Sequence, residues 1–191
     1  QPGQPWQVPY LPIDPADIGR SYQDVIRVNS QSGKGGMGFL LEQHCGLRLP
    51  RRLLLAFARI VQQHLDDSGQ EISAAGLWAL FGQHYVNQGG YAGHQSQQQA
   101  GAVQVRVRVA GCTRTGQGNG ILSAVADALG VAGQVVYFEE KNLGTGTQAQ
   151  AFALIEWQDG DGRSHFGAGL ATDSTTAAVQ ALVGAVCGRG G

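Results

Sequence analysis

Two stretches in the C-terminal half of the chain repeat the same order of sequence patterns, and this repetition constrains the fold more than any other feature. In each stretch, residues typical of strands lead to a helix of small residues. The two helical segments, Leu122–Leu129 and Thr176–Val183, resemble each other in their alanine, valine and leucine residues. A duplicated strands-then-helix unit predicts an α+β fold of two layers, with both helices on one face of antiparallel strands.

The repeated units contain recognisable strands and helix boundaries. In Val103–Val109, valines alternate with glutamine and arginine, the pattern of a strand with one buried face. The glycine-rich turn Gly116–Gly120 leads into helix Ile121–Leu129, and Thr172–Ser174 caps a last helix, Thr175–Val186. The remaining expected strands are Val135–Glu140, Ala149–Trp157 and Arg163–Ala168.

The N-terminal part predicts a small accessory α/β module over residues 1–86. Residues 87–102 are glutamine- and glycine-rich and too polar to bury, so we interpret them as a linker to a C-terminal domain at 103–191. Within the module, the apolar residues of Pro50–Leu65 recur at the three- and four-residue spacing of a helix. The other expected elements are strands at Val25–Val28 and Met37–Leu41 and a helix at Ser73–His84, capped by Ser73.

Composition excludes several classes of partner. Charged residues make up 14% of the chain and the formal net charge is -1, so the basic field that gathers nucleic acid or anionic membranes is missing. No apolar run reaches membrane length and no signal peptide is recognisable, so we expect a cytoplasmic protein. Cys45, Cys112 and Cys187 are far apart, which favours reduced thiols and no metal site.

No catalytic residues are expected within this chain. None of its five histidines has a nucleophile and an orienting carboxylate at a recognisable spacing. Ser32–Gly36 reads SGKGG, but a phosphate-binding loop requires Ser or Thr after the lysine and a helix behind it. Because a strand is expected after this stretch, we interpret it as a hairpin turn.

Two glycine-containing stretches are candidates for ligand contact. Gly118–Gly120 stands directly before a predicted helix, where it can expose free N–H groups to a small anion such as an amino-acid carboxylate. The same residues also suit a simple turn at a helix start, and both interpretations stay open. Gly144–Thr147 is likewise either a plain hairpin or a flexible lip over a pocket.

Taken together, these stretches resemble the 2-isopropylmalate synthases, and the likeness covers nearly the whole chain. Its most specific part is the run Ile26–Gly36, IRVNSQSGKGG, which resembles the region just beyond the catalytic barrel of that family. The further segments that carry the resemblance are Val8–Pro15, Gly19–Arg20 and Leu49–Leu53 in the N-terminal part, and Gly116–Gly120, Ala149–Ala151 and Gly167–Leu170 in the part that resembles the regulatory domain.

The resemblance implies a regulatory and dimerisation role. The family condenses acetyl-CoA with 2-oxoisovalerate in leucine biosynthesis, with a divalent metal held in a TIM barrel. That barrel is not in this chain, so the chain alone is expected to be inactive, with no cofactor of its own. Its implied partners are leucine, a second copy of the chain and the catalytic barrel, with leucine bound between regulatory domains as an allosteric feedback inhibitor.

The resemblance also implies roles for particular residues. Tyr10 would reach toward the absent active site and couple it to the regulator. Lys141–Leu143 departs from the family, which usually has a His-Ala-Leu-like stretch there, and Asn142 could weaken or alter leucine binding. Gly118 and Gly120 would approach the bound leucine, and Phe138 and Asn142 would lie on the wall of its pocket. The residues that would line the pocket for its side chain are Ala149, Ala151 and Leu170.

Two other functions fit these patterns. One is the regulatory domain of a citramalate or homocitrate synthase, which would answer isoleucine or lysine. The other is a stand-alone amino-acid-binding or scaffold protein without any barrel. The stretches Pro9–Pro15 and Asn29–Gly36 favour the leucine pathway over the first alternative.

Overall fold

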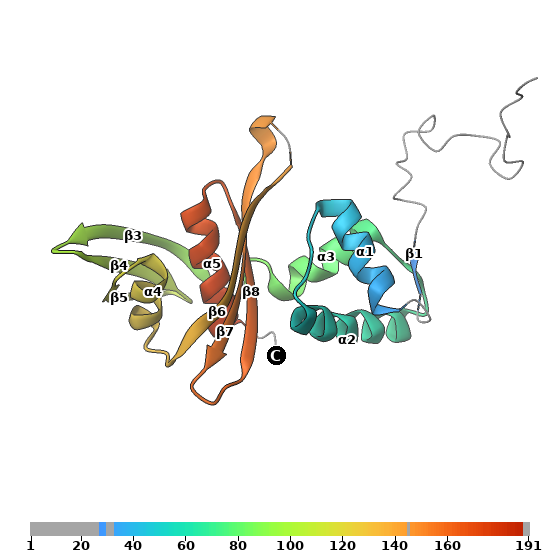
Figure 1. The fold of residues 1–191 in the computed structure, drawn as a ribbon, viewed down its shortest axis with the longest axis horizontal. Coiled ribbons are helices and arrows are strands. Elements are labelled where there is room, and N and C mark those ends of the chain that lie inside the picture. Colours follow the sequence, from blue (N-terminus) through green and yellow to red (C-terminus); the bar gives the residue numbers. More distant parts are fainter. Residues whose placement is uncertain (1–26, 30–32, 145, 189–191) are drawn as a thin grey trace, which may run out of the picture. The chain divides into compact units, whose positions relative to one another are not determined.

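A computed structural model describes residues 27–29, 33–144 and 146–188, so Tyr10 and the strand residues predicted at 25–26 lie outside the described part. The chain divides into two compact units, Gln1–Leu77 and Trp78–Gly191. The division falls within helix α3 (Ala74–Tyr85). Figure 1 shows the elements of both units.

The first unit is mainly helical. Strand β1 (Arg27–Val28) pairs antiparallel with β2 (Ile72–Ser73), which lies far from it in the sequence. The predicted helix at Pro50–Leu65 is confirmed as α2 (Arg51–Ser68). Its buried residues recur every four positions, so they form one stripe against the core: Leu53, Phe57, Val61 and Leu65.

The prediction of a strand at Met37–Leu41 is wrong, because this segment belongs to helix α1 (Lys34–Cys45). Its buried residues, Met37, Leu40 and Leu41, recur at helical spacing and lie on one face. The predicted hairpin turn at Ser32–Gly36 is therefore wrong as well, since Lys34, Gly35 and Gly36 form the first turn of α1. A short apolar run does not by itself separate a strand from one face of a buried helix.

The prediction of a linker at residues 87–102 is also wrong. Tyr91–Gln99 forms strand β3, which pairs antiparallel with β4 (Ala102–Val109). The polar side chains do not oppose this structure, because most of those on β3 are exposed while its backbone groups are bonded within the sheet. The second unit therefore includes the residues that the sequence assigned to a linker.

The second unit consists of two successive copies of three strands and a helix. In the first, β5 (Cys112–Gly118) follows β4 and leads to α4 (Ile121–Leu129). In the second, β6 (Gly133–Leu143), β7 (Gln150–Asp159) and β8 (Ser164–Ala171) lead to α5 (Ser174–Cys187), with a 3-10 turn at Gly146–Gln148. The sheet orders are β3-β4-β5 and β6-β7-β8, all antiparallel.

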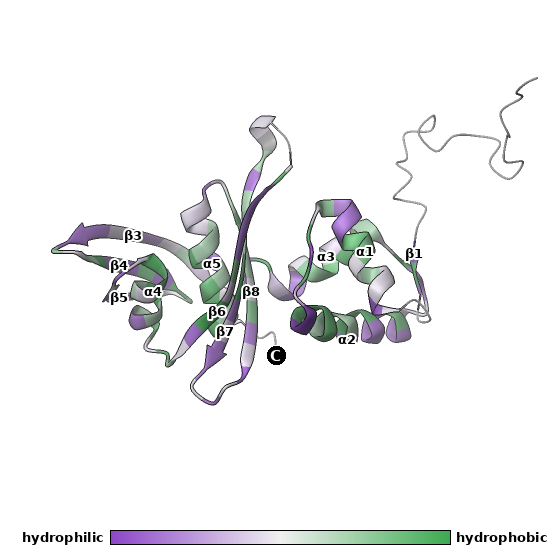
Figure 2. Ribbon diagram, in the orientation of Figure 1, coloured by the Kyte–Doolittle hydropathy of each residue, from purple (hydrophilic) through white to green (hydrophobic). Residues whose placement is uncertain are grey.

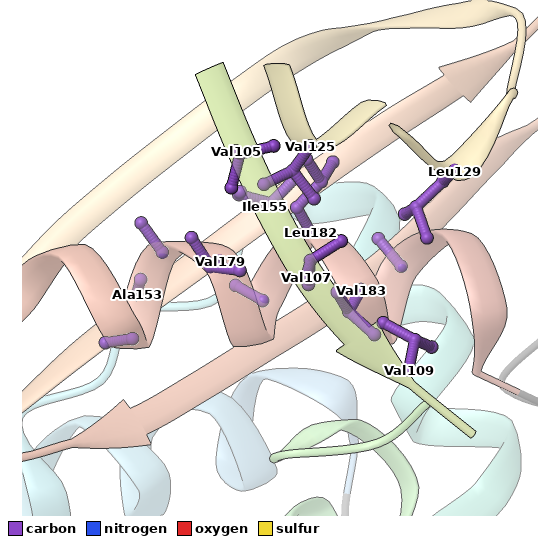
Figure 3. Close-up of a cluster of buried hydrophobic side chains, with 14 of the residues drawn as sticks. Val105, Val107, Val109, Val125, Leu129, Ala153, Ile155, Val179, Leu182 and Val183 are labelled. Carbon is purple, nitrogen blue, oxygen red and sulfur yellow. The ribbon is translucent and has the colours of Figure 1, made fainter. Parts of the chain in front are cut away.

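This arrangement confirms the predicted α+β class and the two-layer duplication. Each helix lies on the sheet of its own copy, α4 on β5 and α5 on β8 (Figure 1). The strands form two sheets, one for each copy. The two copies share one hydrophobic core, in which Val105, Val107 and Val109 of β4 gather with Leu182 and Val183 of α5 (Figure 3).

Pairs of glycines on β5 and β8 bring each helix unusually close to its sheet. A Cβ atom at Gly116 would overlap the backbone of Ala124 and Ala128 in α4. In the second copy, a Cβ atom at Gly167 or Gly169 would overlap backbone carbonyl groups of α5. In both copies the third strand can therefore carry no side chain where the helix crosses it.

The outer faces of the two sheets are different. On β7, the outward residues Phe152 and Leu154 are fully buried, and Trp78 of α3 packs against Phe152 with ring centroids 6.2 Å apart. The corresponding face of the β3-β4-β5 sheet is exposed, and β3 is largely hydrophilic in Figure 2. The second sheet is thus covered on both faces and the first on one.

Candidate functional site

The predicted ligand residues lie in two groups, one in each copy of the repeat. Gly118 ends β5, and Gly120 precedes α4 in an extended conformation with φ -157° and ψ 174°. The other group lies on or beside β6, β7 and β8. It consists of Phe138, Asn142, Ala149, Ala151 and Leu170.

The start of α4 has no side-chain cap, because the residue in the capping position is Gly120. The hydroxyl of Ser123 is occupied locally: it accepts from the Gly120 N–H at 3.1 Å and lies 2.8 Å from the Asn119 side-chain oxygen. A helix start without a side-chain acceptor leaves first-turn N–H groups to water or to an anion. This geometry is compatible with a bound carboxylate and with a simple turn.

Helix α5 begins differently. The Asp173 carboxylate accepts hydrogen bonds from the Thr176 N–H at 2.8 Å and the Thr176 hydroxyl at 2.7 Å. These bonds stabilise the charged carboxylate and lower the pKa of Asp173, with the backbone N–H of Thr176 as the main cause. The predicted cap is confirmed, and the anion-binding position at this helix start is already filled by the chain itself.

Gly118 also has a packing role. A Cβ atom there would overlap Ser123 and Ala124 of α4. No such restriction applies to Gly120, whose Cβ would meet nothing within 4 Å. The need for glycine at position 118 is therefore explained by the close approach of β5 to α4, whereas packing does not explain Gly120.

Three of the predicted residues share one face of the second sheet. Asn142 pairs directly with Ala151. Phe138 pairs with Ile155, four residues away on each strand and therefore on the same face. Ala151 is buried, while Phe138 is 45% exposed on the edge strand β6. Val136, also on β6, is 43% exposed. Val136 and Phe138 therefore expose apolar surface on the open edge strand of this sheet.

Leu170 lies on the opposite face from Ala151. In the register of β7 and β8, Leu170 pairs with Phe152, whereas Ala151 pairs with Ala171. Because side chains of neighbouring positions alternate between faces, Ala171 shares the face of Ala151 and Asn142. Ala149 precedes β7, is exposed, and donates its N–H to the Gly146 carbonyl at 3.3 Å.

Asn87 holds one of the predicted ligand residues, Leu170, and sequence reasoning missed it. Its side-chain amide donates to the Leu170 carbonyl at 3.1 Å, and its side-chain oxygen accepts from the Leu170 N–H at 2.9 Å. Its own backbone N–H donates to the Ala168 carbonyl at 2.9 Å. Asn87 thus holds the outer edge of β8. The sequence feature that could have indicated this role is an asparagine just beyond the end of a helix. Asparagine tolerates the left-handed conformation, and Asn87 has a φ of 55°.

The histidines of the second unit take part in local structural contacts. His165 pairs with Asp159 at 2.8 Å in the hairpin between β7 and β8, and His94 is hydrogen-bonded to the Tyr91 hydroxyl at 2.7 Å. Among the residues that the structure describes, no group of three or more His, Cys, Asp or Glu side chains is placed to hold a metal ion. In the same described part, no helix is long and apolar enough to cross a membrane.

Comparison with known proteins identifies the second unit. The family model described as the LeuA allosteric (dimerisation) domain matches residues 71–187. The chain belongs to this LeuA domain family. A second family model, described as alpha-isopropylmalate synthase, post-catalytic domain-like, matches residues 1–42. The resemblance to the post-catalytic and regulatory parts of 2-isopropylmalate synthases is therefore confirmed.

Full-length relatives of the LeuA domain agree with this assignment. The 2-isopropylmalate synthase of Paraburkholderia phytofirmans is 44% identical over 194 residues, with 97% of this chain and 34% of the relative covered. The enzymes of Cupriavidus taiwanensis and Parvibaculum lavamentivorans are 46% and 41% identical, over 97% and 96% of this chain and 34% of each relative. The chain thus spans about a third of the length of these relatives.

Proposed function

We propose that this chain is the part of a 2-isopropylmalate synthase that binds leucine and transmits feedback inhibition to catalysis. The LeuA match over residues 71–187 supports the regulatory role. In the whole cytoplasmic enzyme, a separate TIM barrel with a divalent metal would condense acetyl-CoA with 2-oxoisovalerate. Tyr10 would reach toward that active site and couple it to the regulator.

The observation that carries the leucine proposal is the uncapped start of α4. A leucine zwitterion needs N–H donors for its carboxylate, and Gly120 leaves such donors at a helix N-terminus without adding a competing side chain. The isobutyl group needs an apolar space, which small residues such as Ala151 and Ala171 leave on the second sheet. Burying a side chain of that size contributes about 2 kcal/mol.

A second copy of the chain would complete the pocket. Val136 and Phe138 are nearly half exposed on an edge strand, and a dimer partner would remove that apolar surface from water. The two groups of predicted ligand residues, one near α4 and one near β6, would then be brought together across the dimer. Inhibition would follow because leucine binds the inhibited arrangement more tightly than the active one.

Substitution of Gly120 tests the position of the carboxylate. In G120D, the new side chain would cap α4 and occupy the anion position, so helix stability should rise while leucine affinity falls at least about tenfold, or 1.4 kcal/mol. G120A is the matched control, because it adds a Cβ atom in open space and no acceptor. Isothermal titration calorimetry gives the affinities. Equal leucine binding by G120D and the unaltered chain would exclude a carboxylate at α4.

The choice of amino acid separates the proposal from its alternatives. Leucine should bind more tightly than valine by about 1–3 kcal/mol, the value of one methylene in an apolar pocket. Isoleucine, an isomer branched at a different carbon, should also bind more weakly, because its shape differs. Tighter binding of isoleucine or lysine would favour the regulator of a citramalate or homocitrate synthase. A folded dimer that binds none of these amino acids would favour the scaffold alternative.

The absence of turnover is a separate expectation. The purified chain mixed with acetyl-CoA and 2-oxoisovalerate should release no free CoA in a thiol assay. Measurable release would contradict the assignment of catalysis to a barrel outside this chain.

A further inference from the structure

The outer face of the β3-β4-β5 sheet is a concentrated array of hydrogen-bond donors that the leucine proposal does not use. Two cross-strand rows define it. Gln95, Arg106 and Thr115 lie opposite one another in the first row, and Gly93, Arg108 and Thr113 do so in the second. Both arginines and both threonines are exposed.

The second row contains a hollow where the strand has no side chain. A Cβ atom at Gly93 would meet nothing within 4 Å, and β3 is irregular between Tyr91 and Gly93. The resulting hollow of about 300 Å³ is lined by His94 and by all residues of these two rows except Thr115, which lines the neighbouring hollow. A larger hollow of about 510 Å³ lies beside it and shares Gln95 and Arg106. The two arginines therefore stand over concave surface.

The charges of this face are unbalanced. In the described part of the chain, neither Arg106 nor Arg108 forms an ion pair with a carboxylate. Arg108 donates one hydrogen bond to the Ala92 carbonyl at 3.1 Å, which leaves most of its donors available. The acidic residue that lines the larger hollow, Asp127, accepts the Gln117 N–H at 2.9 Å.

We propose that Arg106 and Arg108, with Thr113 and Thr115, form a binding site for a phosphate group, either inorganic phosphate or a phosphate monoester. Residues two apart on a strand are about 6.6 Å apart along its axis, so both guanidinium groups can reach one anion between them. A phosphate dianion has the charge and the number of acceptor oxygens to use two guanidinium groups and two hydroxyls. A carboxylate has one charge and two oxygens, so it matches this array less well.

Titration with defined anions at constant ionic strength tests the site. Amide chemical shifts of β3, β4 and β5 in the full chain are followed by NMR during addition of inorganic phosphate, phenyl phosphate or acetate, with chloride as the balancing salt. Both phosphate compounds should saturate the same amides, and acetate should bind at least about tenfold more weakly. Equal responses to phosphate and acetate would overturn the proposal, because general screening would explain them.

Substitutions then separate a built site from diffuse positive charge. R106K keeps the charge but loses the bidentate guanidinium, and T115V keeps the shape but loses the hydroxyl, so each should weaken phosphate binding about fivefold or more. R106Q with R108Q should abolish saturation. R51Q, on α2, is the matched control for loss of one positive charge and should bind as the unaltered chain does. Unchanged binding in R106K and T115V, with folding verified by thermal unfolding, would overturn the proposal.

Discussion

Gly169 shows how much of this domain depends on single atoms. It pairs with Ala153 on the sheet and lies beneath α5, where a Cβ atom would overlap the Ala177 carbonyl group. Because packed interiors relax only partly, the helix cannot move away without losing its other contacts. The small residues of β8 are therefore required by the distance between sheet and helix.

The substitution G169A should destabilise the domain by about 2 kcal/mol or more, since overpacking a core commonly costs about 1–3 kcal/mol. G82A is the matched control, because Gly82 lies in helix α3 and its Cβ would meet nothing within 4 Å. G82A should stabilise by about 0.5–1 kcal/mol, the ordinary preference for alanine in a helix. Urea unfolding measures both. A stable G169A would show that α5 can move off β8.

Asn87 is a second position where one side chain holds a larger element. The substitution N87A removes both side-chain hydrogen bonds to Leu170 and places alanine at a left-handed φ. We expect a loss of about 2–3 kcal/mol from the two bonds and the backbone together. N87G loses the same hydrogen bonds, but glycine adopts the left-handed φ of this position without steric cost. N87G should therefore be less destabilised than N87A. Hydrogen exchange of the Leu170 amide should rise in both variants.

At the scale of elements, helices were predicted from sequence better than strands. The cap at Asp173 and the apolar spacing of Arg51–Ser68 are local signals, because a helix bonds within itself. The partner of a strand lies outside the strand itself. Arg27–Val28 pairs with Ile72–Ser73, far along the chain. Tyr91–Gln99 pairs with the next strand, Ala102–Val109, despite its polar sequence. The apolar segment Met37–Leu41 lies within helix α1, and its buried residues Met37, Leu40 and Leu41 have the spacing of one helix face.

The α5 cap gives a prediction with a defined pH dependence. D173A should destabilise the domain by about 1 kcal/mol at neutral pH, the usual effect of losing an N-cap. The pKa of Asp173 is lowered in the folded state, so the stability from its charge is present above the unfolded pKa of 3.8 and lost as pH falls through the folded pKa. Thermal unfolding between pH 3 and pH 7 measures this.

The variant D173N separates the cap from its charge. Asparagine is a good N-cap without a titrating group, so D173N should keep most of the neutral-pH stability and lose the acid-dependent part. If D173N and the unaltered chain lost stability equally on acidification, Asp173 would not be the group responsible.

At the scale of the whole molecule, the duplicated unit is not symmetric. One sheet buries Phe152 and Leu154 on its outer face, where Trp78 packs against Phe152, whereas the other presents arginine, threonine and glutamine to solvent. The two copies share one core, but only the outer face of the first sheet is exposed and available for binding. Dimerisation and the proposed phosphate binding are therefore expected to use different parts of the two copies.

The substitution F138S tests whether the exposed edge strand of the second sheet, β6, lies in the dimer interface. It should weaken dimer association at least about tenfold, since burying an aromatic side chain contributes about 1.5–3 kcal/mol. F39S is the matched control, because Phe39 on α1 is 54% exposed and lies in the other unit. Analytical ultracentrifugation gives the association constants. Equal dimer constants for F138S and the unaltered chain would place the interface elsewhere.

Sequence alone determined the class, the duplication, the helix boundaries of the second unit and the family, because these depend on periodicity and on local motifs. Tertiary structure alone decided which face each predicted site residue occupies. Leu170 and Ala151 are close in the predicted pocket, yet the register of β7 and β8 puts them on opposite faces. The role of Asn87 in holding Leu170 is evident only from its hydrogen bonds to β8. Such pairings depend on residues far apart in the chain, and no local pattern encodes them.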